Sequence, residues 1–354
     1  MTATTRRALL KAATGAPVAL GAPMIWRKAS AQDRRIVVRD SGGPFTKGFS
    51  EAFYKPFREA TGIEVVGVAS THEPTAQIRS MVETKNFVWD GAEISIAAVR
   101  QLAAGGFVER HGLENDPAVK QLSPEFIDPY GVGSNVYATI LAYRRDRFEG
   151  RRPPQSWADL WDVRGIPGRR AMRKHPFDTI EQALMADGVP RDKVYPCDLD
   201  RAFKSLDRIK PHVITWWTGG TQATQMLISG EVDMVPTWVA RAQAAIDEGA
   251  PVGVSWEGNI WSYDSWCIVK GTPKADLVRE FIKFTCDAKR QAAFTPFVSN
   301  GPTNPDAFRF IDPKKAASLP TAPENKARGL LIDDEYWAKN KDAAIERFNG
   351  WLLT

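Results

Sequence analysis

Apolar and polar residues alternate with two different periods along the first part of the chain. Residues 35–39 have the alternation and the β-branched content of a strand, and 46–61 have the spacing of an amphipathic helix that ends at Gly62. Another strand is predicted over 63–68. A strand, a helix and a strand in this order predict two parallel neighbours in one sheet.

The same succession continues on both sides of a Pro- and Arg-rich stretch, residues 151–154, which we interpret as a linker. Before it we expect a helix over 77–84, a strand over 91–96, a small-residue helix that ends at Gly105, and a long extended run over 136–143. After it we expect helices over 177–186, 199–209, 222–229 and 238–248, and an extended run over 263–269. The pattern predicts an α/β protein.

Residues 1–31 have the features of an export signal. The run Thr5-Arg6-Arg7-Ala8-Leu9-Leu10-Lys11 resembles the twin-arginine signal at every position, and a weakly apolar run over 12–26 follows it. Glycine and proline interrupt that run, which is too short to span a bilayer permanently. Small residues at 29–31 form a peptidase site, so we place the cleavage before Gln32. A basic, unstructured N-terminus is the alternative.

Removal of this signal changes the charge of the protein. The chain has 47 lysine and arginine residues against 42 acidic residues, and five of the basic residues lie in 1–31, where there is no acid. The remaining chain is therefore close to neutral and lacks the basic surface that nucleic-acid binding requires. No other apolar run approaches membrane-spanning length. We expect a soluble exported protein that does not bind nucleic acid.

The chain length and the number of cysteines limit the possible architectures. About 320 residues after cleavage exceed what one hydrophobic core usually supports, which predicts two domains. Cys197, Cys267 and Cys286 are the three cysteines, an odd number without C-x-x-C spacing. We therefore do not expect disulfides to hold the fold together.

Several short motifs occur in the order in which the spermidine/putrescine-binding family of periplasmic solute-binding proteins carries them. Residues 155–162, QSWADLWD, are similar to the P-x-S-W-x-D-L-W-D segment of that family. The other matching segments are 141–146, 230–234 with Trp238, 263–265 and 301–305. They extend over nearly the whole chain after the signal, so the chain resembles this family from end to end.

The resemblance implies a type II periplasmic binding protein, in which two α/β lobes with mixed or parallel sheets are joined by crossover strands. We expect lobe 1 to comprise 32–139 with 265–310, and lobe 2 to comprise 140–264 with 311–354. The resemblance also implies that the lobes close around a small amine, which is then delivered to an ABC transporter permease in the inner membrane. We expect a periplasmic monomer without a cofactor or a metal.

Asp264 is the first candidate ligand contact. It lies in the sequence Trp-Ser-Tyr-Asp-Ser-Trp of 261–266, and burial of an unpaired carboxylate costs several kcal/mol, so Asp264 either lies on a wet strand face or meets a cation. In the family the matching aspartate contacts a ligand amine, and the match of Trp238 lies against the ligand. Asp178 aligns with a further ligand carboxylate, although a helix cap explains it equally well. Six of the twelve tryptophans lie in 216–266, which predicts one aromatic wall of the cleft. We expect some of the six to belong to the core, and only Trp238 is favoured as a ligand contact.

Two departures from the polyamine-binding members make the predicted pocket less negative. His175 stands at one expected acid position, and Arg241 stands where those members have a small residue. Arg241 follows Trp238 by one helical turn and is expected on the same face. A guanidinium repels a diamine but clamps a carboxylate, so Arg241 and Asp264 together suit an ω-amino acid such as 4-aminobutyrate. A solvated helix residue is the alternative for Arg241.

The loop Ser41-Gly42-Gly43 is the last candidate contact. Paired glycines between a strand and a helix permit close backbone approach, and the amide groups of a helix start favour an anionic oxygen. A tight turn without a ligand is the alternative.

The chain contains no motif of the common enzyme classes. The four histidines lack metal-ligand spacing, and no nucleophile elbow or P-loop occurs, so we predict a binding protein and not an enzyme. A hydrolytic site assembled from distant residues is the alternative from another class. Among binding proteins, a polyamine ligand such as putrescine or spermidine, and thiamine or another cationic metabolite, stay open.

The export signal gives the first testable prediction. Replacement of Arg6 and Arg7 by lysine should leave precursor in the cytoplasm, because the twin-arginine route requires both guanidinium groups. Fractionation of cells that express the variant measures this, with the unaltered chain as the control. Normal export of the variant would contradict the assignment.

Overall fold

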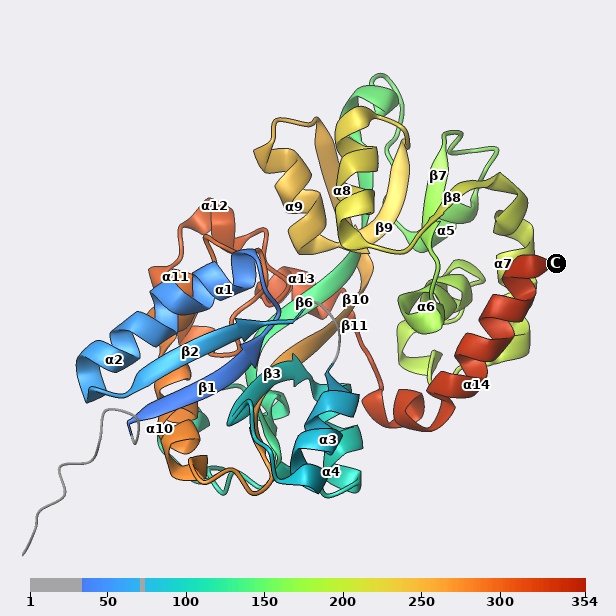
Figure 1. Cartoon of the computed structure of the whole chain (residues 1–354). Helices are drawn as coiled ribbons and strands as arrows, with labels where there is room; N and C mark the ends of the chain where they lie inside the picture. Colours follow the sequence, from blue (N-terminus) through green and yellow to red (C-terminus); the bar gives the residue numbers. More distant parts are fainter. Residues whose placement is uncertain (1–33, 71–73) are drawn as a thin grey trace, which may run out of the picture. The chain divides into compact units, whose positions relative to one another are not determined.

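The computed structural model describes residues 34–70 and 74–354 (Figure 1). The predicted signal over 1–31 and the cleavage before Gln32 lie outside the described residues. The strands are β1 (Arg35–Asp40), β2 (Glu64–Ala69), β3 (Gly91–Ser95), β4 (Val108–Glu109), β5 (Ile127–Asp128), β6 (Gly131–Arg144), β7 (Arg170–Arg173), β8 (Val213–Trp217), β9 (Met234–Trp238), β10 (Val252–Val269) and β11 (Leu330–Leu331).

Helices connect these strands. The α-helices are α1 (Pro44–Phe49), α2 (Lys55–Thr61), α3 (Thr75–Thr84), α4 (Ile96–Ala104), α5 (Trp157–Trp161), α6 (Pro176–Ala186), α7 (Leu199–Ile209), α8 (Gly220–Ser229), α9 (Val239–Asp247), α10 (Ala275–Thr285), α11 (Ala288–Phe294), α12 (Pro313–Ala316), α13 (Pro323–Ala327) and α14 (Asp334–Leu353). A π-helical turn, Ser50–Tyr54, joins α1 to α2.

The predicted alternation of strands and helices is confirmed. β1 and β2 are parallel neighbours, and Gly62 ends α2 in the left-handed conformation with φ of 70°. α7 has the predicted bounds, and the extended run over 136–143 is part of β6. The expectation for 238–248 needs a correction, because Trp238 is the last residue of β9 and the N-cap of α9.

One mixed sheet of eleven strands links the described residues. Eight of them follow the order β2-β1-β3-β10-β6-β9-β7-β8, whereas β4 and β11 pair with β10 and β5 pairs with β6. β10 and β6, the two longest strands, pair antiparallel at its centre. The two predicted sheets are therefore continuous through these two strands. The division of the residues between two lobes stays a prediction.

The aromatic residues around Asp264 belong to the core and do not form a cage. Trp261 and Tyr263 are buried, and the Tyr263 ring packs edge-on against Phe126 with the ring centres 5.1 Å apart. Trp266 is 1% exposed, and its ring centre lies 5.1 Å from the ring centre of Phe49 in α1. The alternation along β10 thus buries the rings among apolar side chains.

In the described part of the chain, Cys197, Cys267 and Cys286 are buried and form no disulfide bond. Among the described residues, no helix combines the length and the apolar character that crossing a membrane requires.

The core position of Trp266 gives a prediction for stability. Trp266→Ala leaves a cavity beside Phe49 and Phe281, so we expect the free energy of unfolding to fall by about 3–5 kcal/mol. Urea unfolding followed by circular dichroism measures the change. As a control, Leu353→Ala removes a side chain that is 91% exposed and should alter stability by less than about 0.5 kcal/mol. An equally small effect for Trp266→Ala would contradict the core assignment.

Candidate functional site

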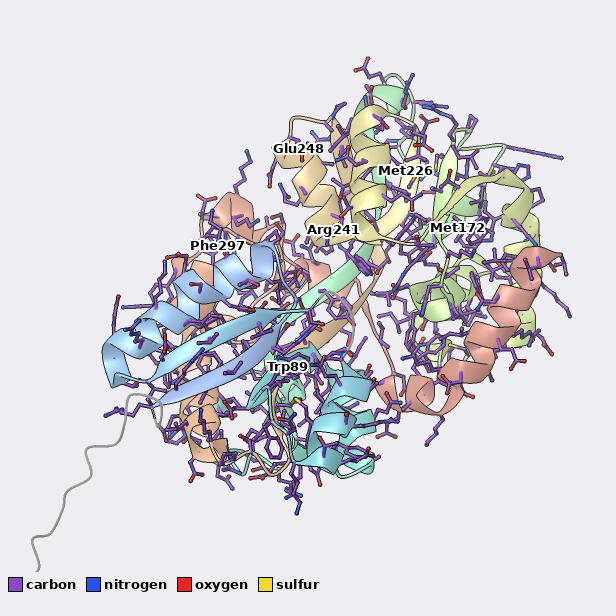
Figure 2. The ribbon with its side chains drawn as sticks, viewed as in Figure 1. Trp89, Met172, Met226, Arg241, Glu248 and Phe297 are labelled. Atoms are coloured by element: carbon purple, nitrogen blue, oxygen red, sulfur yellow. The ribbon has the colours of Figure 1, made fainter. Side chains whose placement is uncertain are left out.

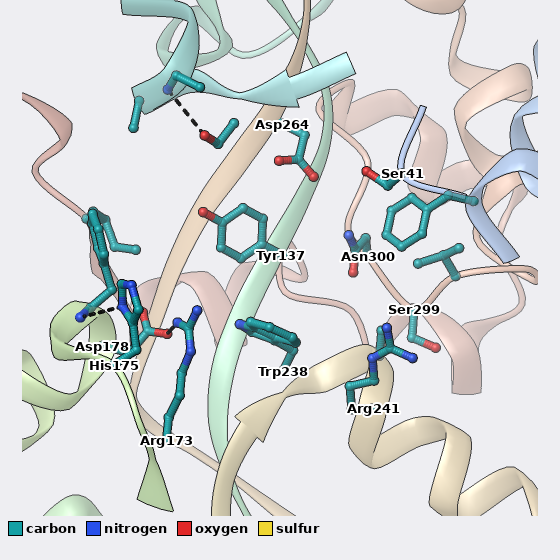
Figure 3. A pocket seen from close by; sticks show the side chains of 18 of the residues that line it. Ser41, Tyr137, Arg173, His175, Asp178, Trp238, Arg241, Asp264, Ser299 and Asn300 are labelled. Atoms are coloured by element: carbon teal, nitrogen blue, oxygen red, sulfur yellow. Dashed lines mark hydrogen bonds and ion pairs between the residues drawn. The ribbon is translucent and has the colours of Figure 1, made fainter. Parts of the chain in front are cut away.

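A cavity of about 660 Å³ lies where several strands end (Figure 3). Ser95, Arg173 and Trp238, which line it, are the last residues of β3, β7 and β9, and Ser41 follows β1 directly. The wall also contains residues of β6, β10, α1, α4, α6, α9, α14 and the segment 296–300. Ligands of open α/β sheets usually bind beyond the carboxyl ends of the strands, so this cavity is the candidate site.

Asp264 supplies a negative charge to the cavity. It is half-buried in β10, which pairs with β3 on one side and with β6 on the other, and its side chain lies near Tyr137 of β6 (Figure 3). Burial raises the pKa of the Tyr137 hydroxyl well above its ordinary value, and the charge of Asp264 raises it further. Tyr137 therefore stays neutral beside a carboxylate that can attract an ammonium group.

A buried hydrogen-bond network lies at the wall near Asp264. Glu93 of β3 has no exposed surface and accepts hydrogen bonds from Ser41 Oγ at 2.9 Å and from Asn135 Nδ2 at 3.0 Å. Burial raises the pKa of Glu93, and Arg39 opposes this rise. The bond to Glu93 fixes the orientation of the Asn135 amide. Its Oδ1 then faces Asn300 and accepts a hydrogen bond from Asn300 Nδ2 at 2.5 Å. Asn300, which lines the cavity, keeps its carbonyl oxygen as an acceptor.

Trp238 and Arg241 line the opposite part of the cavity (Figure 3). Arg241 is half-buried in the first turn of α9 (Figure 2). A Cβ atom at Gly220 would lie 2.7 Å from Arg241 Nε and 2.9 Å from the Trp238 ring, so a glycine here lets the start of α8 pack against both side chains. Among the described residues, no hydrogen bond or ion pair engages the Arg241 guanidinium. It is thus suited to clamp a carboxylate.

Asp178 and Arg173 form an ion pair in the cavity wall. Arg173 Nη1 lies 3.0 Å from Asp178 Oδ2, which also accepts a hydrogen bond from Thr139 Oγ1 at 2.9 Å. The helix cap proposed for Asp178 is provided instead by His175, whose Nδ1 accepts from the Phe177 N–H at 3.2 Å. Burial raises the pKa of Asp178, and Arg173 opposes the rise. The carboxylate is therefore neutralised within the chain.

His175 is neutral at physiological pH. Burial, together with the charges of Arg173 and Lys341, lowers its pKa to about 3. Its ring stacks on Phe177 at 5.2 Å, and Phe177 in turn packs 4.2 Å from the ring centre of Trp337. Because Nδ1 accepts a hydrogen bond, the proton of the neutral ring is on Nε2. The rings of His175, Phe177 and Trp337 are therefore an uncharged, aromatic surface beside the charged side chains of Arg173 and Lys341.

The cavity brings together six of the seven predicted contacts, which are Ser41, Gly42, Asp178, Trp238, Arg241 and Asp264. Gly43 does not line it and instead precedes α1 with φ of 56°, a backbone angle that favours glycine. Contact of these residues with a ligand stays a prediction.

The sequence did not identify Arg173, Tyr137, Asn300 or Trp337. Of the six tryptophans in 216–266, only Trp238, the one favoured as a ligand contact, lines the cavity. The others lie outside its wall, as the buried Trp261 and Trp266 illustrate. Arg173 could have been predicted from its position at the carboxyl end of a parallel strand. The four residues of β7, however, are too few to show the apolar alternation of a strand. Among the described residues, no group of His, Cys, Asp or Glu side chains is arranged to hold a metal ion.

Comparison with known families gives a match over most of the chain. A family model described as bacterial extracellular solute-binding protein matches residues 52–324. A gamma-aminobutyric acid-binding protein of Pseudomonas aeruginosa is 33% identical over 330 residues, which cover 91% of this chain and 92% of that protein.

Solved structures agree in fold. An ABC transporter substrate-binding protein from Bradyrhizobium japonicum is 34% identical with a TM-score of 0.85, and the match covers 90% of this chain and 99% of that structure. A GABA receptor structure is also 34% identical, with a TM-score of 0.81 and coverage of 90% and 97%. The predicted type II periplasmic binding fold is confirmed.

Glu181, which lies behind the aromatic wall, gives a prediction for pH dependence. It is fully buried, its Oε1 accepts hydrogen bonds from Tyr195 and from Trp337 Nε1, and its Oε2 has no partner among the described residues. Burial, followed by the charge of Asp178, raises its pKa from 4.5 to about 7. Between these values the folded protein keeps a proton that the unfolded chain has lost, so the Glu181 contribution to stability falls as pH rises.

Glu181→Gln should remove this contribution, because glutamine does not ionise and still offers an oxygen to Tyr195 and Trp337. The free energy of unfolding of the variant, relative to the unaltered protein, should therefore rise by up to about 3 kcal/mol between pH 4.5 and pH 7. Urea unfolding at several pH values across this range measures it. A difference that does not depend on pH would show that Glu181 is ionised in the folded protein.

Proposed function

Because the chain belongs to the bacterial extracellular solute-binding proteins, we propose that it captures a small amine for an ABC importer. The first candidate ligand is an ω-amino acid such as 4-aminobutyrate. Proteins of this family bind solutes outside the cytoplasm, and this chain works there too. Delivery of the signal-bearing precursor by the twin-arginine route, to the periplasm, is part of the proposal.

The observation that carries the proposal is that Asp264, Trp238 and Arg241 line one cavity (Figure 3). An ω-amino acid has an ammonium at one end, a carboxylate at the other, and methylene groups between. Asp264 suits the ammonium, Arg241 suits the carboxylate, and the Trp238 ring offers an apolar surface to the methylenes. The two relatives named for gamma-aminobutyric acid support the same ligand.

A ligand as small as 4-aminobutyrate can reach micromolar affinity. 4-Aminobutyrate has about seven heavy atoms, and the best small ligands reach about −1.5 kcal/mol per heavy atom. Micromolar affinity requires about −8 kcal/mol. Two charge-assisted contacts of about 1.5–3 kcal/mol each supply a large part of this free energy, provided that water is excluded from both.

A polyamine is the second candidate, and the cavity is less suited to it. Putrescine or spermidine would place two or more cations in a cavity whose wall already holds Arg173, Arg241 and Lys341, and one of the four aspartates that line it, Asp178, is paired with Arg173. Like charges in a cavity with little water repel each other strongly. Thiamine or another cationic metabolite would be repelled by the same two arginines.

Capture requires closure of the two lobes around the ligand, as the family resemblance implies, and docking of the closed form on the permease of the importer. We propose that the protein acts as a monomer, without nucleic acid, and that it releases its ligand unchanged.

Calorimetry on two variants tests the ligand assignment. Asp264→Asn should weaken 4-aminobutyrate and putrescine by roughly tenfold or more, because each amine loses a charge-assisted contact. Arg241→Ala should weaken 4-aminobutyrate by a similar factor but spare or improve putrescine, because it removes a repelling cation.

Arg290→Ala is the matched control, since Arg290 is also half-buried against an aromatic ring, that of Phe284 at 4.6 Å, but does not line the cavity. It should leave both affinities unchanged. If Arg241→Ala does not alter the preference between the two ligands, a polyamine becomes the better assignment. If Asp264→Asn has no effect, the ligand lies elsewhere.

A further inference from the structure

Arg173 is a cation of the cavity wall that the proposed ligand does not use. It ends β7, only 22% of its side chain is exposed, and it lines the cavity. Its guanidinium carbon lies 4.9 Å from the ring centre of Trp238 and 5.9 Å from that of Trp217. In Figure 3, Arg173 and Arg241 lie on opposite sides of Trp238. The indole therefore separates two guanidinium groups in one cavity.

The backbone holds the partner of Arg173 in an unusual conformation. Asp178 is 3% exposed and has φ of 67°, although it is not glycine. The only other such residue in the described chain is Lys85, at the C-cap of α3. A positive φ costs a non-glycine residue free energy and is often found at functional sites. Here it directs Asp178 Oδ2 to Thr139 and to Arg173, which fixes the guanidinium over the ring.

Most of the hydrogen-bonding capacity of Arg173 is left for a ligand. A guanidinium has five N–H donors, and within the described residues only Nη1 donates, to Asp178. Nε and Nη2 have no hydrogen-bond partner there. Lys341 lies close enough to lower the pKa of His175, so a second cation belongs to this part of the cavity, with Asp342 beside it on α14.

The volume of the cavity also exceeds what a small ω-amino acid fills. About seven heavy atoms, each taking at most the roughly 30 Å³ of a water molecule in the liquid, occupy about 200 Å³. The cavity measures about 660 Å³, so more than half of it is left in the form described.

We propose that Arg173, held by Asp178 and Thr139 over the Trp238 ring, forms a second anion-binding subsite of the same cavity. This subsite takes a second carboxylate, carried on a substituent of the amine whose ammonium lies at Asp264. The ligand class is thus an ω-amino acid with an additional carboxylate arm on its nitrogen. The inference rests on the proposed function for the placement of the amine, and Asp178 is a positioning residue in it.

Three probes test the subsite by isothermal titration calorimetry. They are 4-aminobutyrate, N-(carboxymethyl)-4-aminobutyrate and N-(2-hydroxyethyl)-4-aminobutyrate, and the last two have arms of similar length that differ in charge. We expect the carboxymethyl probe to bind the unaltered protein roughly tenfold or more tightly than the hydroxyethyl probe, because a charge-assisted contact forms at Arg173. Equal affinities, or tighter binding of the hydroxyethyl probe, would overturn the inference.

The double variant Arg173→Met/Asp178→Asn removes the subsite without leaving a buried charge unpaired. The ratio of the two affinities should fall to about one, and this ratio cancels any general loss of affinity that both probes share. Arg347→Met is the matched control, since Arg347 also pairs with an aspartate, Asp200 at 2.7 Å, and lies over a ring, that of Phe203 at 4.4 Å, but outside the cavity. It should keep the ratio.

Should the double variant not fold, as judged by circular dichroism, Arg173→Lys replaces it. Lysine keeps the charge beside Asp178 but loses the planar fork, so the ratio should fall while the protein stays folded. A ratio that either variant leaves unchanged overturns the inference.

The results separate this inference from the proposed function. If 4-aminobutyrate binds but the ratio does not depend on Arg173, the inference fails and the proposed function stands. If 4-aminobutyrate does not bind but the carboxymethyl probe binds through Arg173, the subsite stands and the ligand assignment fails. Failure of all three probes to bind overturns both.

Discussion

Carboxylates that leave water must meet hydrogen-bond donors or cations, and this constraint organises the wall of the cavity. Three acids behind or within that wall are buried, namely Glu93, Asp178 and Glu181. The donors that satisfy them are themselves residues of the cavity or neighbours of such residues. Asp178 fixes Arg173 over an indole, and Glu181 fixes the ring of Trp337 by its N–H. Polar contacts hidden from the ligand therefore set the positions of the groups that could touch it.

The strand order provides the frame for these contacts. β6 and β10 run through the centre of the sheet, and the ends of β1, β3, β7 and β9 reach the cavity from both sides of this pair. The pairing of β10 with β6 shifts register beside Asp264, where Ser265 faces Gly133 and Ser134 is the extra residue. Such an irregularity changes the direction of neighbouring side chains. The sheet therefore places Asp264 by its local geometry as well as by its order of strands.

The sequence predicted the alternation of elements well, because apolar periodicity and glycine at helix ends are local signals, as Gly62 illustrates. It also predicted that Trp238, Arg241 and Asp264 share one cavity, because Trp238 and Asp264 match the family and Arg241 follows Trp238 by one helical turn. It could not tell that the carboxylate of Asp178 is already paired, because its partner Arg173 is the last residue of a strand of only four residues, too short for a clear pattern. Apolar periodicity alone could not distinguish core tryptophans from a cavity-lining one, since both are equally apolar, and only the match to the family singled out Trp238. What the sequence missed depends on contacts between segments that are distant along the chain.

The difference between the two arginines beside Trp238 bears on how a ligand would be selected. Arg173 has a partner in the chain, whereas Arg241 has no hydrogen bond or ion pair among the described residues. In the open cavity water solvates both guanidinium groups at little cost. In the proposed closed state that water is removed, and a guanidinium without a counter-ion becomes expensive to bury. A ligand with a carboxylate offsets this cost, whereas a diamine adds to it. Closure would then favour anionic amines because a wrong ligand leaves Arg241 unpaired, and selection would depend on the repulsive contact as much as on the attractive one.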